Sequence, residues 1–296
     1  PGLIPRLGTY QGISIREDSV YTNHEGEEDR RIREGAEKAL TKVQEPLRRV
    51  IQGDETILYI ANCRAPVSAI EQFTMGWYMS RAMLSVVVLT NRRLLHVLLK
   101  GNGDWRKALR SVSWGDVQEA KVKGWRVRTL HLRYRNGKKE KFWQLRRDDG
   151  RKIAMLIPAI RAGGGLESTG AQGMVSLCPA CLAPLTPRNY RCDRCGMGFK
   201  DEARLVRRAL LIPGGGYFYV GHMLLGLANS IAETVLLAAF ILCLAGGLAG
   251  VTAMYGTAFI LGVFLAIGKS LAIHHGRRFV RDFIPIKVES AGLMAI

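Results

Sequence analysis

The 296-residue sequence predicts a multidomain chain, in which a small β domain is followed by a short cysteine-rich segment and a C-terminal α-helical transmembrane hairpin. Three observations predict this order. Short β-branched and apolar runs fill residues 53–146, and two CxxC pairs lie within residues 178–195. No Lys, Arg, Asp or Glu occurs from Thr234 to Gly268, which is longer than the ~20 apolar residues that one spanning helix needs.

The charge and the cysteines narrow the class of protein. The net charge is +18, and the stretch from Lys100 to Lys152 holds seventeen Lys/Arg against six Asp/Glu. A basic body suits anionic lipid headgroups or nucleic acid, although a solvated surface has the same composition. Four of the six cysteines form one cluster, while Cys63 and Cys243 lie far from it. This is no disulfide framework, and it indicates a reducing compartment.

The N-terminal region is predicted to be an arm followed by a helix. Residues 1–25 mix Gly, Pro and polar residues without a period, which predicts a loose or partly ordered arm. From Glu27 onward apolar residues recur every three or four positions, as an amphipathic helix requires. Pro46 is expected to end or kink that helix.

The β region shows three apolar runs and one hairpin signal. Thr56–Ala61, Leu84–Leu89 and Leu94–Leu98 read as strands, and Asn136-Gly137 predicts a two-residue hairpin turn with φ > 0 at both positions. All five tryptophans fall in this region, and we expect them to build its core; they are Trp77, Trp105, Trp114, Trp125 and Trp143. Arg147–Ile160 predicts a closing helix whose last turn is disturbed by Pro158.

Two segments carry a resemblance to a known fold. Val87–Leu95 resembles the strand-turn-strand signature of bacterial pleckstrin-homology-like (PH/GRAM) domains, and Ser113–Val117 resembles the strand that follows in that family. The resemblance covers residues 52–161. It implies a curved seven-strand β sandwich or barrel that is capped by a C-terminal helix, although the sequence has no localised Lys/Arg motif for phosphoinositide binding.

The cysteine spacing points to a metal. Two CxxC pairs, each on one tight turn, can place four thiolates around Zn²⁺; the ligands are Cys178, Cys181, Cys192 and Cys195. The segment 176–200 resembles a zinc ribbon. Because cysteine fills all four positions, no open position remains for a catalytic water, and a structural zinc is expected. A redox dithiol or an iron centre is the alternative.

The C-terminal region is predicted to cross a membrane twice. Gly246-Gly247 and Gly250 offer a turn inside the uncharged stretch, and basic residues flank it on both sides. By the positive-inside rule both flanks are cytoplasmic, which requires an even number of spans. The expected location is therefore the bacterial inner membrane, with both termini cytoplasmic.

A second resemblance lies at the start of this region. Leu211–Gly221 resembles the Pro-Gly-x-Gly-x-x-Tyr-x-Gly signature of small bacterial two-helix membrane domains. Glu233 stands alone between apolar runs, and with His222 it is a candidate for a proton or metal path. A residue at the interface or at an oligomer seam is the alternative interpretation.

These features predict a membrane-anchored adaptor, not an enzyme. The domains are residues 1–51 (arm and helix), 52–161 (PH-like β domain), 162–175 (Gly-rich linker), 176–200 (zinc ribbon), 201–281 (membrane domain) and 282–296 (tail). Candidate lipid or partner contacts are Arg126, Arg128, Arg133, Arg135, Lys138 and Lys139. The alternatives are a membrane-tethered nucleic-acid binder, or an oligomeric transporter or channel component that uses Glu233. A homo-oligomer fits any of these.

Overall fold

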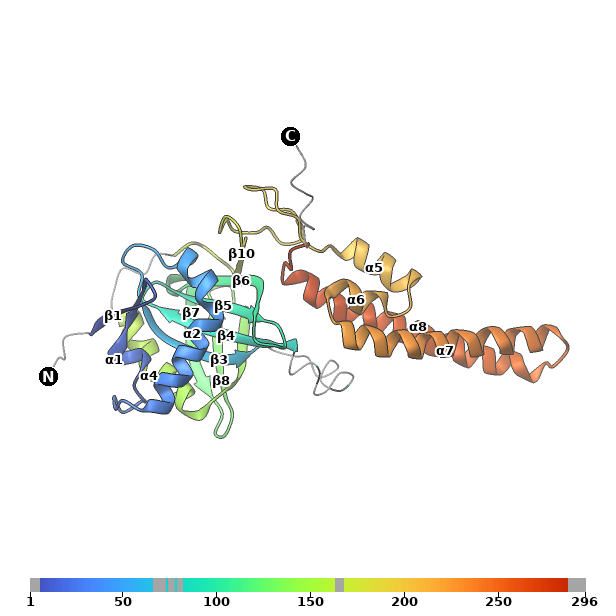
Figure 1. Ribbon diagram of the computed structural model, residues 1–296, viewed down its shortest axis with the longest axis horizontal. Helices are drawn as coiled ribbons and strands as arrows, with labels where there is room; N and C mark the ends of the chain where they lie inside the picture. The colour runs from blue at the N-terminus through green and yellow to red at the C-terminus, as the bar shows by residue number, and fades with distance from the viewer. Residues whose placement is uncertain (1–5, 66–72, 74–77, 79–81, 163–167, 287–296) are drawn as a thin grey trace. The chain divides into compact units, whose positions relative to one another are not determined.

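The computed structural model describes residues 6–65, 73, 78, 82–162 and 168–286, and these form two compact units (Figure 1). The sheet unit contains the described residues up to Thr186 together with Cys192–Cys195. The hairpin unit contains Pro187–Arg191 and the described residues from Gly196 onward. The chain therefore passes from one unit to the other on both sides of the second cysteine pair.

The sheet unit is built on one large, mainly antiparallel sheet. Its strands are β1 (Leu7–Tyr10), β2 (Ile13–Arg16), β3 (Ile57–Arg64), β4 (Leu84–Thr90), β5 (Arg93–Leu99), β6 (Trp105–Ser113), β7 (Val117–Lys123), β8 (Arg128–Tyr134), β9 (Lys139–Leu145) and β10 (Val175–Leu177). Its helices are α1 (Glu17–Val20), α2 (Arg30–Val50), the short η1 (Trp114–Asp116) and α4 (Arg147–Ala162). The hydrogen-bonded order is β10-β6-β5-β4-β3-β9-β8-β7, with β1 and β2 joined to β3 off this path.

Both faces of the four strands β3–β6 are buried. On one face, Ile60, Val88 and Val97 pack with Leu40 and Leu47 of α2. The opposite face packs against residues of β7–β9 and of α4. A strand covered on both faces is apolar at nearly every position. This explains why β4 and β5 read as continuous apolar runs, and it confirms the strands expected at residues 84–89 and 94–98.

The N-terminal arm is held against the core of the sheet unit. Residues 6–25 are ordered, with β1 and β2 paired as a hairpin and Ile15 of β2 bridged to Ile57 of β3. Ile13, Ile15 and Val20 are buried in the same core as α2. Only two isoleucines alternate in β2, and so short a pattern does not distinguish a strand from a loop. Residues 6–25 are therefore an ordered part of the predicted arm.

Helix α2 has a capped N-terminus and a buried last turn. The side chain of Asp29 accepts a hydrogen bond from the Arg31 N–H at 2.7 Å and caps the N-terminus. Pro46 lies inside the helix, is buried, and does not end it. An interior proline removes one backbone hydrogen bond, and Leu47 and Val50, buried beyond it, hold the last turn against the sheet.

The β8–β9 hairpin has a longer turn than predicted. Only Gly137 of the Asn136-Gly137 pair has positive φ, at +80°. The Gly137 N–H donates to the Tyr134 carbonyl and the Tyr134 N–H donates to the Lys138 carbonyl, both at 2.9 Å. This is a type I turn followed by a left-handed glycine, so Asn136 needs no positive φ.

The tryptophans do not all build the core. Trp105 and Trp114 are buried, and the Trp114 indole donates to the Thr90 carbonyl at 2.9 Å. Trp143 is half-buried, and Trp125 is 74% exposed, so the expectation of a shared core is wrong for Trp125. Trp77 lies outside the described residues.

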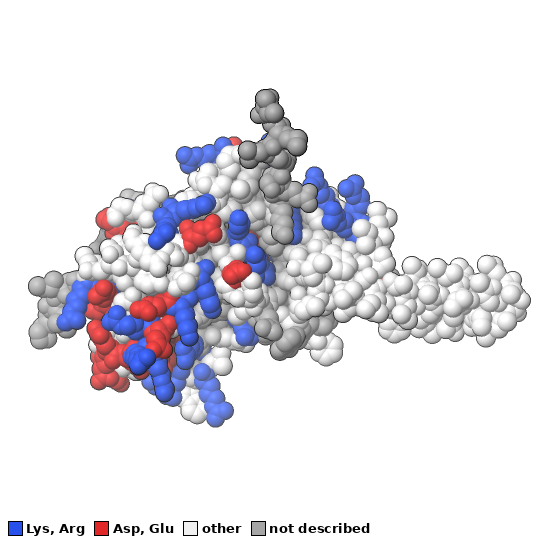
Figure 2. All heavy atoms as spheres, viewed as in Figure 1, with Lys and Arg blue, Asp and Glu red and all other residues white. Residues whose placement is uncertain are grey.

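The hairpin unit consists of α5 (Glu202–Leu211), α6 (Gly215–Val220), α7 (Met223–Leu248) and α8 (Ala253–Arg281). Helices α7 and α8 run side by side as an antiparallel hairpin (Figure 1), and both are long and apolar enough to cross a membrane. Large apolar side chains on them are exposed, including Leu224 and Phe259. Figure 2 shows no charged side chain along the outer part of this hairpin.

Candidate metal centre

The first cysteine pair is positioned by the sheet unit. Strand β10 pairs with β6 and leads directly into Cys178. The Arg49 guanidinium of α2 donates to the Pro179 carbonyl at 2.9 Å, and Leu182 packs against the core under α2. The turn closes when the Leu182 N–H donates to the Cys178 carbonyl at 2.9 Å. The first pair therefore lies on a loop fixed to the sheet and to α2.

The second cysteine pair, Cys192 and Cys195, lies next to the first. Cys192 is buried and Cys195 is exposed. Gly196 follows with φ +73°, a left-handed conformation that glycine adopts without strain. On either side of the pair, Arg191 and Gly198 form an antiparallel bridge.

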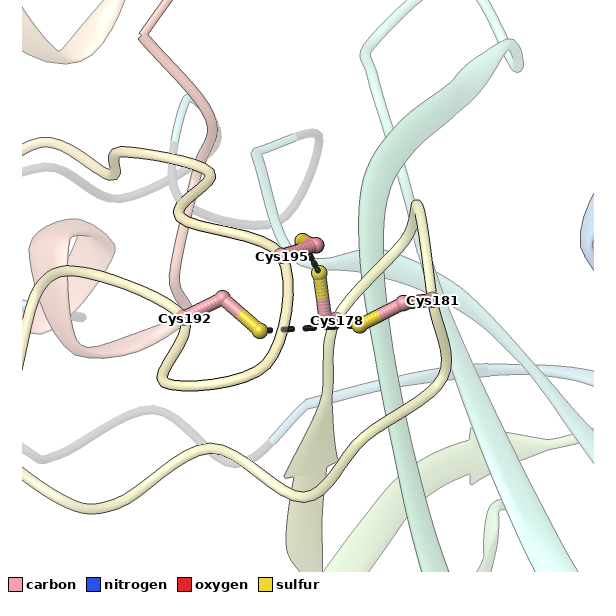
Figure 3. A group of neighbouring side chains, drawn as sticks. All are labelled: Cys178, Cys181, Cys192 and Cys195. Atoms are coloured by element: carbon pink, nitrogen blue, oxygen red, sulfur yellow. Dashed lines mark hydrogen bonds between the residues drawn. The ribbon is translucent and has the colours of Figure 1, made fainter.

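The four cysteine side chains lie together, with their sulfur atoms directed toward one another (Figure 3). The Sγ atoms of Cys178 and Cys195 are 3.6 Å apart, and those of Cys181 and Cys192 are 3.5 Å apart. All four lie within 4.8 Å of one another. With Zn–S bonds of ~2.3 Å, tetrahedral thiolates lie ~3.8 Å apart. The short separations join one cysteine of each pair, and they far exceed the ~2.0 Å of a disulfide. The cluster thus fits a metal ion, in agreement with the predicted ligands.

Burial acts against free thiolates at this centre. It raises the pKa of the Cys178 thiol to about 12. Burial also acts to raise the pKa of Cys192, but the N–H groups of Cys195 and Arg194 and the neighbouring thiols outweigh it and lower that pKa to about 7. A dication supplies the charge that stabilises four ionised ligands together, so metal binding and thiol ionisation are coupled.

Asp116 anchors the segment before β10, a role that the sequence did not predict. Asp116 accepts hydrogen bonds from Ser168 Oγ and Thr169 Oγ1, both at 2.6 Å, and from the Gly170 N–H at 2.9 Å. These bonds hold the pKa of Asp116 below its usual value, although burial acts the other way. The described part of the predicted linker is therefore attached to the sheet unit. A lone aspartate after Trp-Gly gives no sequence signal for this role.

In the hairpin unit, the buried carboxylate of Glu233 forms an ion pair with the half-buried Lys269. Lys269 Nζ lies 2.7 Å from Glu233 Oε2, which also accepts from the Gly214 N–H at 3.0 Å. Asn229 donates to the other carboxylate oxygen at 2.7 Å, and Lys269 also donates to the Ala209 carbonyl at 2.7 Å. The network joins α7, α8, the C-terminal end of α5 and the turn before α6.

This arrangement differs from the Glu233–His222 path suggested by the sequence. The His222 ring lies against Phe279, with ring centroids 4.3 Å apart. Glu233 and Lys269 are equally distant along the chain from Val251, which follows the turn of the hairpin. That symmetry is the sequence signal that pairs them.

We expect the ion pair to be essential to the packing of the hairpin unit. Replacing Lys269 by Met leaves the buried Glu233 carboxylate without its cation, and breaking a buried pair costs about 3–5 kcal/mol. The double variant Glu233→Gln, Lys269→Met removes both charges and should recover part of the loss. Thermal unfolding in detergent compares the stability of the unaltered chain, the single variant and the double variant. Equal stability of K269M and the unaltered chain would contradict a structural role for the pair.

The glycines of the Pro213–Gly221 segment permit close packing. Gly214 has φ +68°, and a Cβ on Gly215 would lie 2.2 Å from the Arg208 carbonyl oxygen. Gly216 packs against Ala209 and Ala272. The segment thus forms a tight corner between α5 and α7, which places the Gly214 N–H against Glu233.

The two ends of the helical hairpin are tied together. Glu202 of α5 pairs with Arg281 at 3.2 Å and with Arg277 at 3.6 Å, both on α8. Two residues that precede α5 contact two that follow α8. The Lys200 N–H donates to the Ile284 carbonyl at 3.0 Å, and the Phe199 and Phe283 rings pack edge to face. The residues before α5 and after α8 therefore lie side by side.

The six predicted basic contacts do not form one patch. Arg133 and Lys139 are opposite each other on β8 and β9, and Arg135 and Lys138 lie in the following turn. Arg126 lies in the β7–β8 loop, whereas Arg128 packs against Gly150 of α4.

Comparisons with protein-family models, curated proteins and solved structures gave no match for this chain.

Proposed function

We propose that this chain is an integral membrane adaptor of the bacterial inner membrane. In this proposal a PH-like domain and a zinc ribbon lie on the cytoplasmic side and bind a protein or anionic lipid. The observation that carries the proposal is the α7–α8 pair, whose apolar side chains are exposed while its two ends are tied together. Exposing such a large apolar surface to water is unfavourable, whereas contact with the hydrocarbon core of a bilayer is favourable.

The contacts of the hairpin unit support two spans. Glu202 with Arg281, and Lys200 with Ile284, join the chain before α5 to the chain after α8. If α7 and α8 both cross the bilayer, these contacts require both flanks to lie on one side. The flanks are rich in arginine, which favours the cytoplasmic side. Helices α5 and α6 are too short to span, with 10 and 6 residues.

The sheet unit supports the adaptor role through its architecture. Strands β3–β6 and β7–β9, followed by α4, have the number and order of elements that the PH-like resemblance implies. The cysteine cluster supports a structural zinc, because all four donors are thiols. Lys269 neutralises Glu233 within a closed hydrogen-bond network, which favours an anchoring role over a transport path.

The topology is testable with single added cysteines. Thr252→Cys, in the loop between α7 and α8, should react with a membrane-impermeant thiol reagent on spheroplasts. Lys38→Cys, on the exposed side of α2, should react only after the membrane is opened. The chain without an added cysteine supplies the background. Reaction of Lys38→Cys on intact spheroplasts would contradict the orientation, and recovery of the chain in the soluble fraction would contradict membrane anchoring.

A further inference from the structure

The outward face of strands β7–β9 carries almost only one sign of charge. Alternate residues of these strands, including Leu130, Leu132 and Phe142, point into the core, so the residues between them face outward. The outward titratable residues are the bases Lys121, Lys123, His131, Arg133, Lys139 and Lys141, and the acid Glu119. We name this set the basic sheet face.

The strand register gathers basic side chains together. Lys121 of β7 and Lys141 of β9 lie on either side of His131, and Arg133 of β8 lies between its like charge Lys139 on β9 and the acid Glu119 on β7. Like charges directly opposite destabilise a sheet. The pKa of His131 is lowered by partial burial and by the nearby Lys141 and Lys123. Glu119, which pairs with Lys121, offsets only part of this repulsion. An anionic partner would relieve the remainder.

An apolar tip lies at one end of the basic sheet face. The loop between β7 and β8 exposes 74% of Trp125 and 56% of Val127, and the Arg126 guanidinium lies 5.7 Å from the centre of the Trp125 ring. Gly124 has φ +103°, and a Cβ there would lie 2.2 Å from the Val127 carbonyl oxygen. The loop is therefore a tight turn that presents Trp125 outward, next to Lys123 at the end of β7.

We propose that the basic sheet face and the Trp125 loop form a second membrane contact, which binds anionic phospholipid headgroups. Trp125 and Val127 enter the interfacial region, where tryptophan is favoured. Lys121, Lys123 and Lys141 bind the headgroups, and each basic residue near an anionic surface strengthens binding roughly five-fold. This inference rests on the proposed membrane anchoring, because α7 and α8 keep the sheet unit at high local concentration beside a bilayer.

Lipid is favoured over nucleic acid by the apolar tip. A single exposed indole beside an aliphatic side chain suits the boundary between headgroups and acyl chains. Single-stranded nucleic acid is usually held by several aromatic side chains along a basic groove. On the basic sheet face itself the only aromatic side chain besides His131 among the described residues is Trp143, which is half-buried.

The test uses the full chain reconstituted into vesicles that contain brominated lipid, which quenches nearby tryptophan. Quenching is measured for the unaltered chain and for Trp125→Phe, and the difference reports Trp125 alone. With brominated phosphatidylglycerol we expect a clear Trp125 signal. That signal should be lost in vesicles of brominated phosphatidylcholine alone, and at about 1 M salt, where the screening length is about 3 Å.

Matched charge reversals locate the contact. Lys121→Glu with Lys141→Glu should reduce the Trp125 signal to that of neutral vesicles. Lys38→Glu with Lys42→Glu makes the same charge change on the exposed side of α2 and should leave the signal intact. Equal quenching in neutral and anionic vesicles, or equal effects of the two charge reversals, would overturn the inference. So would oligonucleotides that abolish the signal at concentrations below those of the lipid. These outcomes leave membrane anchoring untouched, whereas failure of the chain to enter vesicles at all would refute the proposed function.

Discussion

The purified chain carrying Cys192→Ser is expected to lose its metal and to become sensitive to trypsin at Arg188, Arg191 and Arg194. The unaltered chain should contain one Zn²⁺ per molecule. Structural zinc contributes about 10–16 kcal/mol of apparent binding free energy in zinc-finger peptides, so loss of one thiolate from a four-thiolate site removes a dominant local stabiliser. Metal analysis and limited proteolysis measure the two effects. The three arginines are exposed in the loop that carries the second cysteine pair.

The matched control is Cys243→Ser, which alters a cysteine of α7 far along the chain from the cluster. It should retain the metal and the proteolysis pattern. In Cys192→Ser the core of β3–β6 should persist, because Leu40, Val88 and their neighbours pack without using the cysteines. A chain that is folded and resists trypsin at these arginines without bound metal would exclude a structural metal site.

A fragment of residues 52–186 is expected not to fold, whereas residues 6–186 should. Removing α2 strips Leu40, Val43 and Leu47, all fully buried, from one face of β3–β6. Each such side chain contributes about 1.5–3 kcal/mol through burial. Together they contribute about 4.5–9 kcal/mol, which is comparable to the lower half of a typical domain stability of about 5–15 kcal/mol. Urea unfolding of both fragments, monitored by circular dichroism, measures the difference in their unfolding free energies.

Point variants separate packing from fragment effects. Leu47→Ala in residues 6–186 should lower the unfolding free energy by about 2–5 kcal/mol, as large-to-small core substitutions do. Lys38→Ala, on the exposed side of the same helix, should change it little. Cooperative unfolding of residues 52–186 at the same urea concentration as the longer fragment would show that α2 is dispensable. The comparison also tests whether the predicted PH-like domain, residues 52–161, can fold without α2.

The sequence predicted those parts of the fold in which one local pattern decides the structure. Cysteine spacing located the metal centre, since two CxxC turns have few other uses. Continuous apolar runs located β4 and β5, because burial on both faces removes polar positions. The closing helix was also found, with Ile153 and Ile157 buried as its period requires.

Features that depend on distant partners were not predictable in this way. Ile13 and Ile15 look like part of a loop until α2 covers the same core. The role of Asp116 requires residues more than fifty positions later to return to it. The outward residues Lys121 and Lys141 belong to strands whose pairing was unknown, so the candidate contacts included Arg128, which packs on α4, and omitted both lysines. Trp125 was placed in a core by residue type alone, although its loop points outward.

In the proposed membrane anchoring, the position of the Glu233–Lys269 pair also limits how thick a bilayer the helical hairpin can match. From Thr234 to Leu248, α7 carries no charged residue, which is a length of about 22 Å at 1.5 Å per residue. The corresponding stretch of α8, from Ala253 to Gly268, is about 24 Å long. Both are shorter than the ~30 Å hydrocarbon core of an average membrane. Hydrophobic mismatch should therefore favour lipids with short acyl chains around this protein, or a local thinning that brings the ion pair to the headgroup boundary.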